Sequence, residues 1–217
     1  MTQRPITARG RATRERIVTA ASELIRERGV AQTSLDDVIA RVGASKSQLY
    51  HYFEDRAALL RAVVDHNSEQ VLGDLGRLDD SWKAIRAWLD SMVELQVERR
   101  GYGGCPIGTL VPQLGETDEQ ARRALADSFT RWEAYLRDGL RAMQDNGKLD
   151  RRADPDTLAT ATMASIQGGL LLTQTRRDPG QLEIALDAAY AHLRAHAATG
   201  ANRAGPRRPG GVRRAAP

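Results

Sequence analysis

The chain has 217 residues, of which 41% are hydrophobic and 28% charged, a balance typical of globular proteins with one large or two small domains. No apolar run approaches the ~20 residues that span a bilayer, the first residues lack the apolar core of a signal peptide, and the single cysteine excludes an intrachain disulfide. We therefore expect a cytoplasmic protein without a membrane partner.

Charge is distributed unevenly along the sequence. Residues 1–53 carry nine basic and five acidic residues, a net charge of +4. Residues 54–197 carry eighteen basic and twenty-three acidic residues, or −5, and residues 198–217 carry five arginines and no acid, or +5. The basic charge thus lies in the N-terminal segment and the tail, as expected where only part of a protein meets nucleic acid.

Residues 1–11 contain three arginines and no apolar periodicity, which predicts a flexible basic arm. Such an arm either reaches DNA phosphates or a minor groove, or is a solvated tail. A first helix is expected over about residues 12–28, ending at Gly29. Its inward face is formed by apolar residues at helical spacing: Ile17, Ala20, Ala21, Leu24 and Ile25.

Two short helices joined by a tight turn are predicted over residues 33–53. Thr33 or Ser34 can cap the first of them, and with Thr33 as the cap Asp36 takes the third position of an acidic capping box. A glycine ends this helix, and Ser45 is a natural cap for the second.

The second of these helices has only two inward apolar anchors, Leu49 and Phe53. Its other side chains are polar, or aromatic with a hydrogen-bonding tip. Such an outer face suits a DNA major groove. A helical hairpin in any all-α protein fits the same periodicity, and periodicity alone leaves both interpretations open.

The segment GASKSQLYHYF closely resembles the recognition-helix signature of TetR-type (TetR/AcrR) transcriptional regulators. The resemblance is specific over about residues 12–65 and concerns only the order of helices beyond them. It implies an all-α fold with a three-helix DNA-binding head at residues 12–54 and a ligand-binding and dimerisation body at residues 55–197. It also implies a regulator, expected to be a repressor, that binds palindromic double-stranded operator DNA as a homodimer and is released by a small molecule.

The same resemblance assigns roles to individual positions of the head. Side chains expected at base edges or the adjoining backbone are Lys46, Ser47, Gln48 and His51, and the cap Ser45 belongs to the same interface. Side chains expected mostly at phosphates are Thr33, Ser34, Tyr50, Tyr52 and Arg56. The family usually carries a lysine at the position of Arg56, so this chain departs from the pattern but keeps the charge.

Cap signals divide the body into helices. The expected bounds are about 56–78, 81–100, 118–146, 155–175 and 181–196, with 198–217 as a disordered basic tail. The corresponding start signals are Asp55, Asp80 or Ser81, a capping box of Thr117 and Gln120, Asp154 before Pro155, and Pro179. Pro106 is expected to open a further short helix, and Gly73 and Gly76 weaken the end of the helix that links head and body.

Residues 157–175 contain no charged residue, and a helix without a polar face is buried on all sides. This helix is either central in its own subunit or covered by a second copy. TetR-type regulators dimerise through their last two helices, which favours a homodimer through residues 155–175 and 181–196. Two recognition helices would then lie about one DNA turn apart on a palindromic site.

Bulky residues of the body are candidates for the walls of a pocket that suits a small, largely apolar effector. They are Trp88, Met92, Leu95, Leu110, Phe129, Trp132, Met163, Ile166 and Leu170, with Gln96 and Gln167 as polar anchors. Plain core packing is the alternative role for each. Cys105 completes the set, either as a low-pKa thiol near a helix start that senses electrophiles or oxidants, or as a small buried hydrophobe.

Enzymatic alternatives have little support in the sequence, which shows no strand pattern and no glycine-rich phosphate loop. His192 and His196 are four residues apart and could share a metal, but neither has an acidic or cysteine partner nearby in sequence. Catalysis by Cys105 with a distant histidine is equally weakly motivated. We therefore expect no catalytic residue, no cofactor and no metal.

Overall fold

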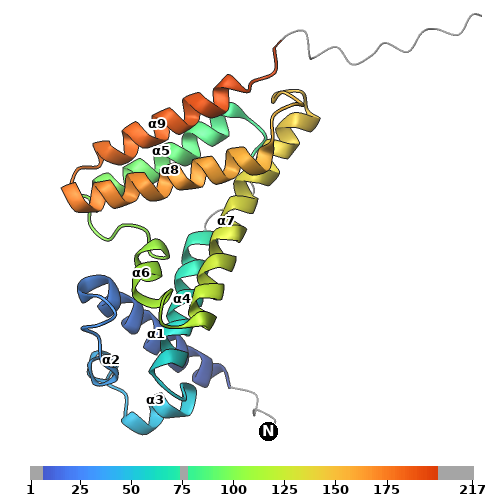
Figure 1. The fold of residues 1–217 in the computed structure, drawn as a ribbon. Coiled ribbons are helices and arrows are strands. Elements are labelled where there is room, and N and C mark those ends of the chain that lie inside the picture. The colour runs from blue at the N-terminus through green and yellow to red at the C-terminus, as the bar shows by residue number, and fades with distance from the viewer. Residues whose placement is uncertain (1–6, 74–77, 200–217) are drawn as a thin grey trace, which may run out of the picture.

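The computed structural model describes residues 7–73 and 78–199 (Figure 1). The helices are α1 (Ala8–Arg28), α2 (Leu35–Val42), α3 (Lys46–Tyr52), α4 (Arg56–Gly73), α5 (Trp82–Glu98), the 3-10 turn η1 (Gly108–Leu110), α6 (Val111–Leu114), α7 (Glu119–Asp145), α8 (Pro155–Arg176) and α9 (Gly180–Ala195). Within the described residues the only β feature is an isolated bridge between Leu149 and Ala197, so the predicted all-α fold class is confirmed.

Some sequence-based expectations fall on residues that the structure does not describe. Most of the basic arm, Gly76 and nearly all of the basic tail lie outside the described residues. In the part of the chain that is described, no helix is both long and apolar enough to cross a membrane.

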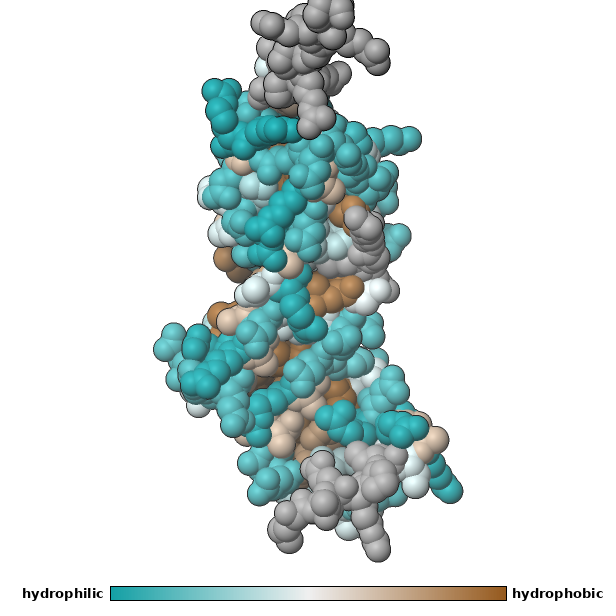
Figure 2. Space-filling model, turned by 90° about the vertical axis from the view of Figure 1, so that its right-hand side faces the viewer, coloured by the Kyte–Doolittle hydropathy of each residue, from teal (hydrophilic) through white to brown (hydrophobic). Residues whose placement is uncertain are grey.

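Helices α5, α8 and α9 form a layer at the top of Figure 1, and α4 and α7 run from it to the head, which is made of α1, α2 and α3. Helix α7 packs against both α4 and α8, and α4 packs against α1. The short α6 lies between the layer and α1. One continuous apolar core extends through head and body. On the face shown in Figure 2, hydrophilic residues cover the ridges, and hydrophobic ones show mainly in hollows.

Helix α1 begins earlier than expected. The Thr7 hydroxyl accepts a hydrogen bond from the N–H of Gly10 at 3.1 Å, so Thr7 caps a helix that starts at Ala8 instead of near residue 12. The last four residues of the predicted flexible arm, residues 8–11, are therefore helical. A threonine cap so far from the apolar stripe is a weak signal in a sequence.

Helix α7 is capped by Asp118 and not by Thr117. One carboxylate oxygen of Asp118 accepts from the N–H groups of Gln120 and Ala121, both at 2.9 Å. A carboxylate satisfies two free N–H groups at once and suits the positive end of the helix, which explains why it displaces the threonine hydroxyl.

The segment between α5 and α6 departs furthest from expectation, because Pro106 opens no helix. The chain first turns through Gly101, Gly103 and Gly104, all with positive φ, and the first-turn proline is Pro112 in α6. A Cβ on Gly101 would lie 3.1 Å from backbone atoms of Arg177, so this turn is pressed against the end of α8. Glycine is needed there for both conformation and space.

Helices α8 and α9 pack closely through Gly169, where a Cβ would lie 2.8 Å from a methyl carbon of Leu182. The other face of α8 is open in the single chain. Its exposed residues are Thr160, Ala164, Gly168, Leu171, Leu172 and Thr175. The alternative in which this helix is central in its own subunit is therefore wrong, because its neighbours α9 and α7 cover only part of its surface. Cover by a second copy stays a prediction.

Candidate nucleic-acid interface and effector pocket

Helix α3 presents most of its side chains to solvent. Its cap is a reciprocal box, in which the Ser45 hydroxyl accepts from the N–H of Gln48 at 3.2 Å and Gln48 Oε1 accepts from the N–H of Ser45 at 2.9 Å. Leu49 is fully buried and fixes the helix on the head. The exposed side chains of the helix are Lys46, Ser47, Gln48, Tyr50 and His51, whereas Tyr52 is half-buried.

This geometry limits what Gln48 can offer to a base. Its Oε1 is committed to the helix cap, and among the described residues no partner is found for its Nε2. The side chain therefore has only its amide donors to offer, and donation to a base acceptor stays a prediction. Lys46 makes only a 3.8 Å ion pair with Asp36 between two exposed side chains, which leaves it available to a phosphate.

The start of α2 separates the two predicted cap residues. Ser34 is the cap, because its hydroxyl accepts from the N–H of Asp37 and its own N–H donates back to the Asp37 carboxylate. The Ser34 hydroxyl, which also donates to the Asp37 carboxylate at 2.6 Å, and then the Ser34 N–H hold the pKa of Asp37 below its usual value. Thr33 is only 6% exposed and donates to the carbonyl of Gly29. Contact of Thr33 with a phosphate stays a prediction, which this burial does not favour.

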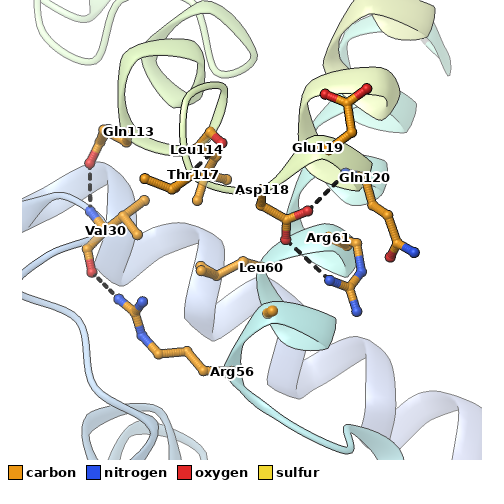
Figure 3. A pocket seen from close by; sticks show the side chains of 11 residues that line it. Val30, Arg56, Leu60, Arg61, Gln113, Leu114, Thr117, Asp118, Glu119 and Gln120 are labelled. Carbon is orange, nitrogen blue, oxygen red and sulfur yellow. Dashed lines mark hydrogen bonds and ion pairs between the residues drawn. The ribbon is translucent and has the colours of Figure 1, made fainter.

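Arg56 begins α4 and is exposed, but part of its guanidinium is already in use. Its Nη2 donates to the carbonyls of Val30 and Thr33, which fixes the loop between α1 and α2 (Figure 3). Arginine has five N–H donors, so a phosphate contact through the others remains a prediction.

A pocket of about 580 Å³, here called the junction pocket, lies where the head meets α6 and α7 (Figure 3). It is lined by Val30, Arg56, Ala57, Leu60, Arg61, Gln113, Leu114, Thr117, Asp118, Glu119 and Gln120. Two polar contacts join residues of its lining. Gln113 Oε1 accepts a hydrogen bond from the N–H of Val30 at 2.7 Å, and Arg61 Nη1 forms an ion pair with the Asp118 carboxylate at 3.1 Å. The first contact ties the head to the body, and the second joins α4 to α7 within the body.

A further polar link runs through the core from the head to the segment before α6. The Ser22 hydroxyl of α1 donates to the side-chain oxygen of Asn67 in α4 at 2.6 Å, and the Asn67 amide donates to the carbonyl of Pro106 at 3.0 Å. Asn67 is buried, so both halves of its amide are satisfied by protein groups.

A second pocket, of about 540 Å³ and here called the effector pocket, lies between the segment of residues 105–113, α7 and α8. It is lined by Cys105, Gly108, Thr109, Val111, Pro112, Gln113, Phe129, Gln167, Leu170, Leu171 and Gln174. No charged residue is among them. The volume suits a small molecule, and the mixture of aliphatic, aromatic and carboxamide groups is typical of ligand sites.

The structure brings only some of the predicted ligand residues together. Cys105, Phe129, Gln167 and Leu170 line the effector pocket. The predicted residues that do not line it are Trp88, Met92, Leu95, Gln96, Leu110, Trp132, Met163 and Ile166. Most of these pack in or against the apolar core, and Leu95 is exposed. The sequence prediction missed the wall formed by η1 and α6, because that wall consists of short polar and proline-containing turns without periodicity.

Cys105 does not have the environment of a reactive thiol. It is 5% exposed, and this burial raises the pKa of its thiol, opposed only in part by the N–H of Gly108, which donates to Sγ at 3.2 Å. The expected lowering of the pKa by a helix start is wrong, because no helix begins at Pro106. The structure therefore favours the alternative of a small buried side chain that contributes to a pocket wall.

In the described part of the chain, no group of three or more histidine, cysteine, aspartate or glutamate side chains is placed to hold a metal ion. His192 and His196 stack edge to face, with ring centroids 5.3 Å apart.

The three-helix head, with one polar helix exposed above a buried leucine, defines a helix-turn-helix DNA-binding protein. Comparison with known proteins agrees with this. Residues 17–63 match the model for bacterial regulatory proteins of the tetR family, and residues 81–188 match that for the C-terminal domain of LmrA/YxaF-like transcriptional regulators. The chain therefore belongs to the TetR family of transcriptional regulators, and it is not an enzyme.

Individual relatives extend over most of the chain. An uncharacterized HTH-type transcriptional regulator in the lacX 3′ region of Lactococcus lactis is 31% identical over 182 residues, which cover 82% of this chain and 91% of that protein. The HTH-type transcriptional repressor DhaR from Mycobacterium sp. strain GP1 is 25% identical, with 78% and 86% covered. The crystal structure of a TetR regulator from Chloroflexus aurantiacus has a TM-score of 0.77 at 24% identity, with 88% and 98% covered, and shows the same fold.

Proposed function

We propose that this chain is a ligand-responsive repressor of the cytoplasm. As a homodimer it binds a palindromic operator, and a small, largely apolar effector releases it. The observation that carries the proposal is the effector pocket of about 540 Å³, because it lies in the body and shares Gln113 with the junction to the head. The relative DhaR is named a repressor, which supports the direction of control.

The dimer is supported by an exposed aliphatic face, which we define as the exposed residues Thr160, Ala164, Gly168, Leu171, Leu172 and Thr175 of α8 with Ile184, Ala188, Ala191 and Ala195 of α9. Leu171 is 64% exposed and Ile184 68%. No member of the set is charged, although α9 also exposes Glu183, Asp187 and Arg194 outside it. Large aliphatic side chains gathered on two neighbouring helices are typical of a surface that a second copy covers.

Release requires only a modest preference of the effector for the released state. A coupling free energy of about 1–3 kcal/mol changes operator affinity by several-fold to about a hundredfold. In this mechanism the effector alters how the body holds the head, and the spacing of the two α3 helices no longer matches the two half-sites. The hydrogen bond between Val30 of the head and Gln113 of the body supports such coupling.

The experiment is a fluorescence anisotropy titration of labelled DNA from upstream of the protein's own gene, with unrelated DNA as a control. We expect saturable, specific binding with two protomers per site, and release by uncharged small molecules from a screen. The Cys105→Ser variant should respond like the wild type, because burial raises the thiol pKa. Absence of any specific site in that DNA and in a random-sequence selection would contradict the proposal.

A further inference from the structure

Gln113 is the one residue that lines both the junction pocket and the effector pocket. It lies on α6, whose four residues separate the two spaces. Both halves of its side-chain amide are engaged: Oε1 accepts from the N–H of Val30, and Nε2 donates to the carbonyl of Thr109, each at 2.7 Å. Thr109 also lines the effector pocket. A single side chain thus connects the wall of one pocket to the backbone of the head.

The hydrogen bond from Val30 to Gln113 holds the loop between α1 and α2 of the head. Val30 is 5% exposed, and its N–H is held by Gln113 while its carbonyl is held by Arg56. The loop that contains Val30 leads directly to Ser34, the cap of α2. Loss of the Gln113 bond would leave a buried N–H without a partner, so this peptide would have to move or open to water.

The lining of the effector pocket indicates what class of molecule can reach Gln113. Its polar side chains are the carboxamides of Gln113, Gln167 and Gln174, the Thr109 hydroxyl and the Cys105 thiol, beside the apolar Phe129, Leu170 and Leu171. An ionised ligand would find no counter-charge in this lining, and burying an unpaired charge is costly. Carboxamides both donate and accept, which suits an uncharged molecule with carbonyl, amide or hydroxyl groups on an apolar frame.

We propose that Gln113 is the coupling residue of this regulator: an uncharged, hydrogen-bonding effector engages the Gln113 amide in the effector pocket and thereby releases the backbone of Val30. The inference rests on the proposed function and names the regulation of that same site. Gln113 acts on the head through the backbone of Val30, in the loop between α1 and α2.

The test uses three probes of similar size and different charge: naphthamide, naphthoate and naphthylmethylammonium. Binding is measured by calorimetry on the full chain, and the protection of the Val30 N–H by amide hydrogen exchange with NMR detection. We expect naphthamide to bind and to accelerate exchange at Val30, and the two ions to bind at least about tenfold more weakly. Equal binding of an ion, or no binding of naphthamide, would overturn the proposed ligand class.

The variant Gln113→Met keeps the size of the side chain and removes both polar groups. We expect faster exchange at Val30 without any probe, and naphthamide binding that no longer changes exchange or operator affinity. Gln113→Glu retains an acceptor for Val30 and serves if the first variant folds poorly; it should keep Val30 protected and abolish the response. The control Gln174→Met changes the same pocket but has no contact with Val30, so it should weaken naphthamide binding and leave the resting protection intact.

A wild-type response retained in both Gln113 variants would overturn the coupling role. Failure of the proposed function would be distinct, because the wild type would then bind no specific operator while the exchange measurement at Val30 still reports on Gln113.

Discussion

Helix α3 and the pair α8–α9 both leave helical surface uncovered in the described chain, and the two surfaces differ in chemistry. The exposed side of α3 carries hydrogen-bond donors, including Lys46, Gln48 and His51. The exposed aliphatic face carries no charge and includes Leu171 and Ile184. A donor-rich surface remains solvated until it meets a polyanion, whereas an aliphatic surface is stabilised by leaving water. The two surfaces therefore suit different partners, DNA and a second copy.

The largest effect on assembly and operator binding is expected when charge is placed on the exposed aliphatic face. The double variant Leu171→Glu, Ile184→Glu should be monomeric, because two carboxylates would be buried in the interface without partners. Operator affinity should fall by more than about a hundredfold, since two linked heads bind far more tightly than one. Light scattering should give 23.8 kDa in place of twice that mass.

The control for this variant is Val97→Glu, which changes an exposed aliphatic residue of α5 outside that face. It should leave mass and operator affinity unchanged. A dimer that persists in the double variant would show that the subunits associate elsewhere.

The second prediction tests the polar surface. Gln48→Glu keeps the acceptor that caps α3 and replaces the free amide donor with a carboxylate. We expect a loss of about 1–3 kcal/mol on the cognate operator and relaxed sequence preference. Gln48→Ala should relax preference too, but it also loses the cap. Circular dichroism separates the two causes, and equal loss on specific and random DNA for either variant would argue against base recognition.

The third prediction tests whether Arg56, at the start of α4, contacts a phosphate. Arg56→Ala should weaken binding to all sequences alike and lower the salt slope by about one, if a free N–H of Arg56 meets a phosphate. Arg56→Lys should retain the salt slope but lose the two hydrogen bonds that Arg56 donates to the carbonyls of Val30 and Thr33. An unchanged slope in the alanine variant would limit Arg56 to holding the loop.

The smallest expected effect concerns the ion pair between Arg61 of α4 and Asp118, the cap of α7. Asn at position 118 still caps α7, so Asp118→Asn should lower the melting temperature by only about 1–3 °C at neutral pH. Backbone N–H bonds, chiefly from Ala121, and Arg61 hold the pKa of Asp118 below 3.8. A lowered pKa stabilises the fold above the unfolded pKa, and this contribution is lost as pH falls through the folded value. The difference between variant and wild type should therefore shrink below about pH 4 in calorimetry.

Local signals along the chain suffice to predict the helix-turn-helix and most helix bounds. The Ser45–Gln48 box joins residues three apart, and Leu49 in α3 and Phe53 at its C-cap are both buried. The charge-free stretch of residues 157–175 likewise predicted a helix that is either central in its subunit or covered by a second copy. Local patterns left the choice between Thr33 and Ser34 open, and they favoured Thr117 over Asp118, because adjacent residues have similar capping propensity.

The position of the effector pocket and its connection to the head depend instead on contacts between residues far apart in sequence. Gln113 and Val30 are 83 residues apart in sequence, and nothing periodic marks either of them. Thr33 is buried by the loop around it, and Cys105 has a raised thiol pKa because of its neighbours in space. Such contacts depend on the packing of α1, α4, α6 and α8 together, which no window of sequence contains.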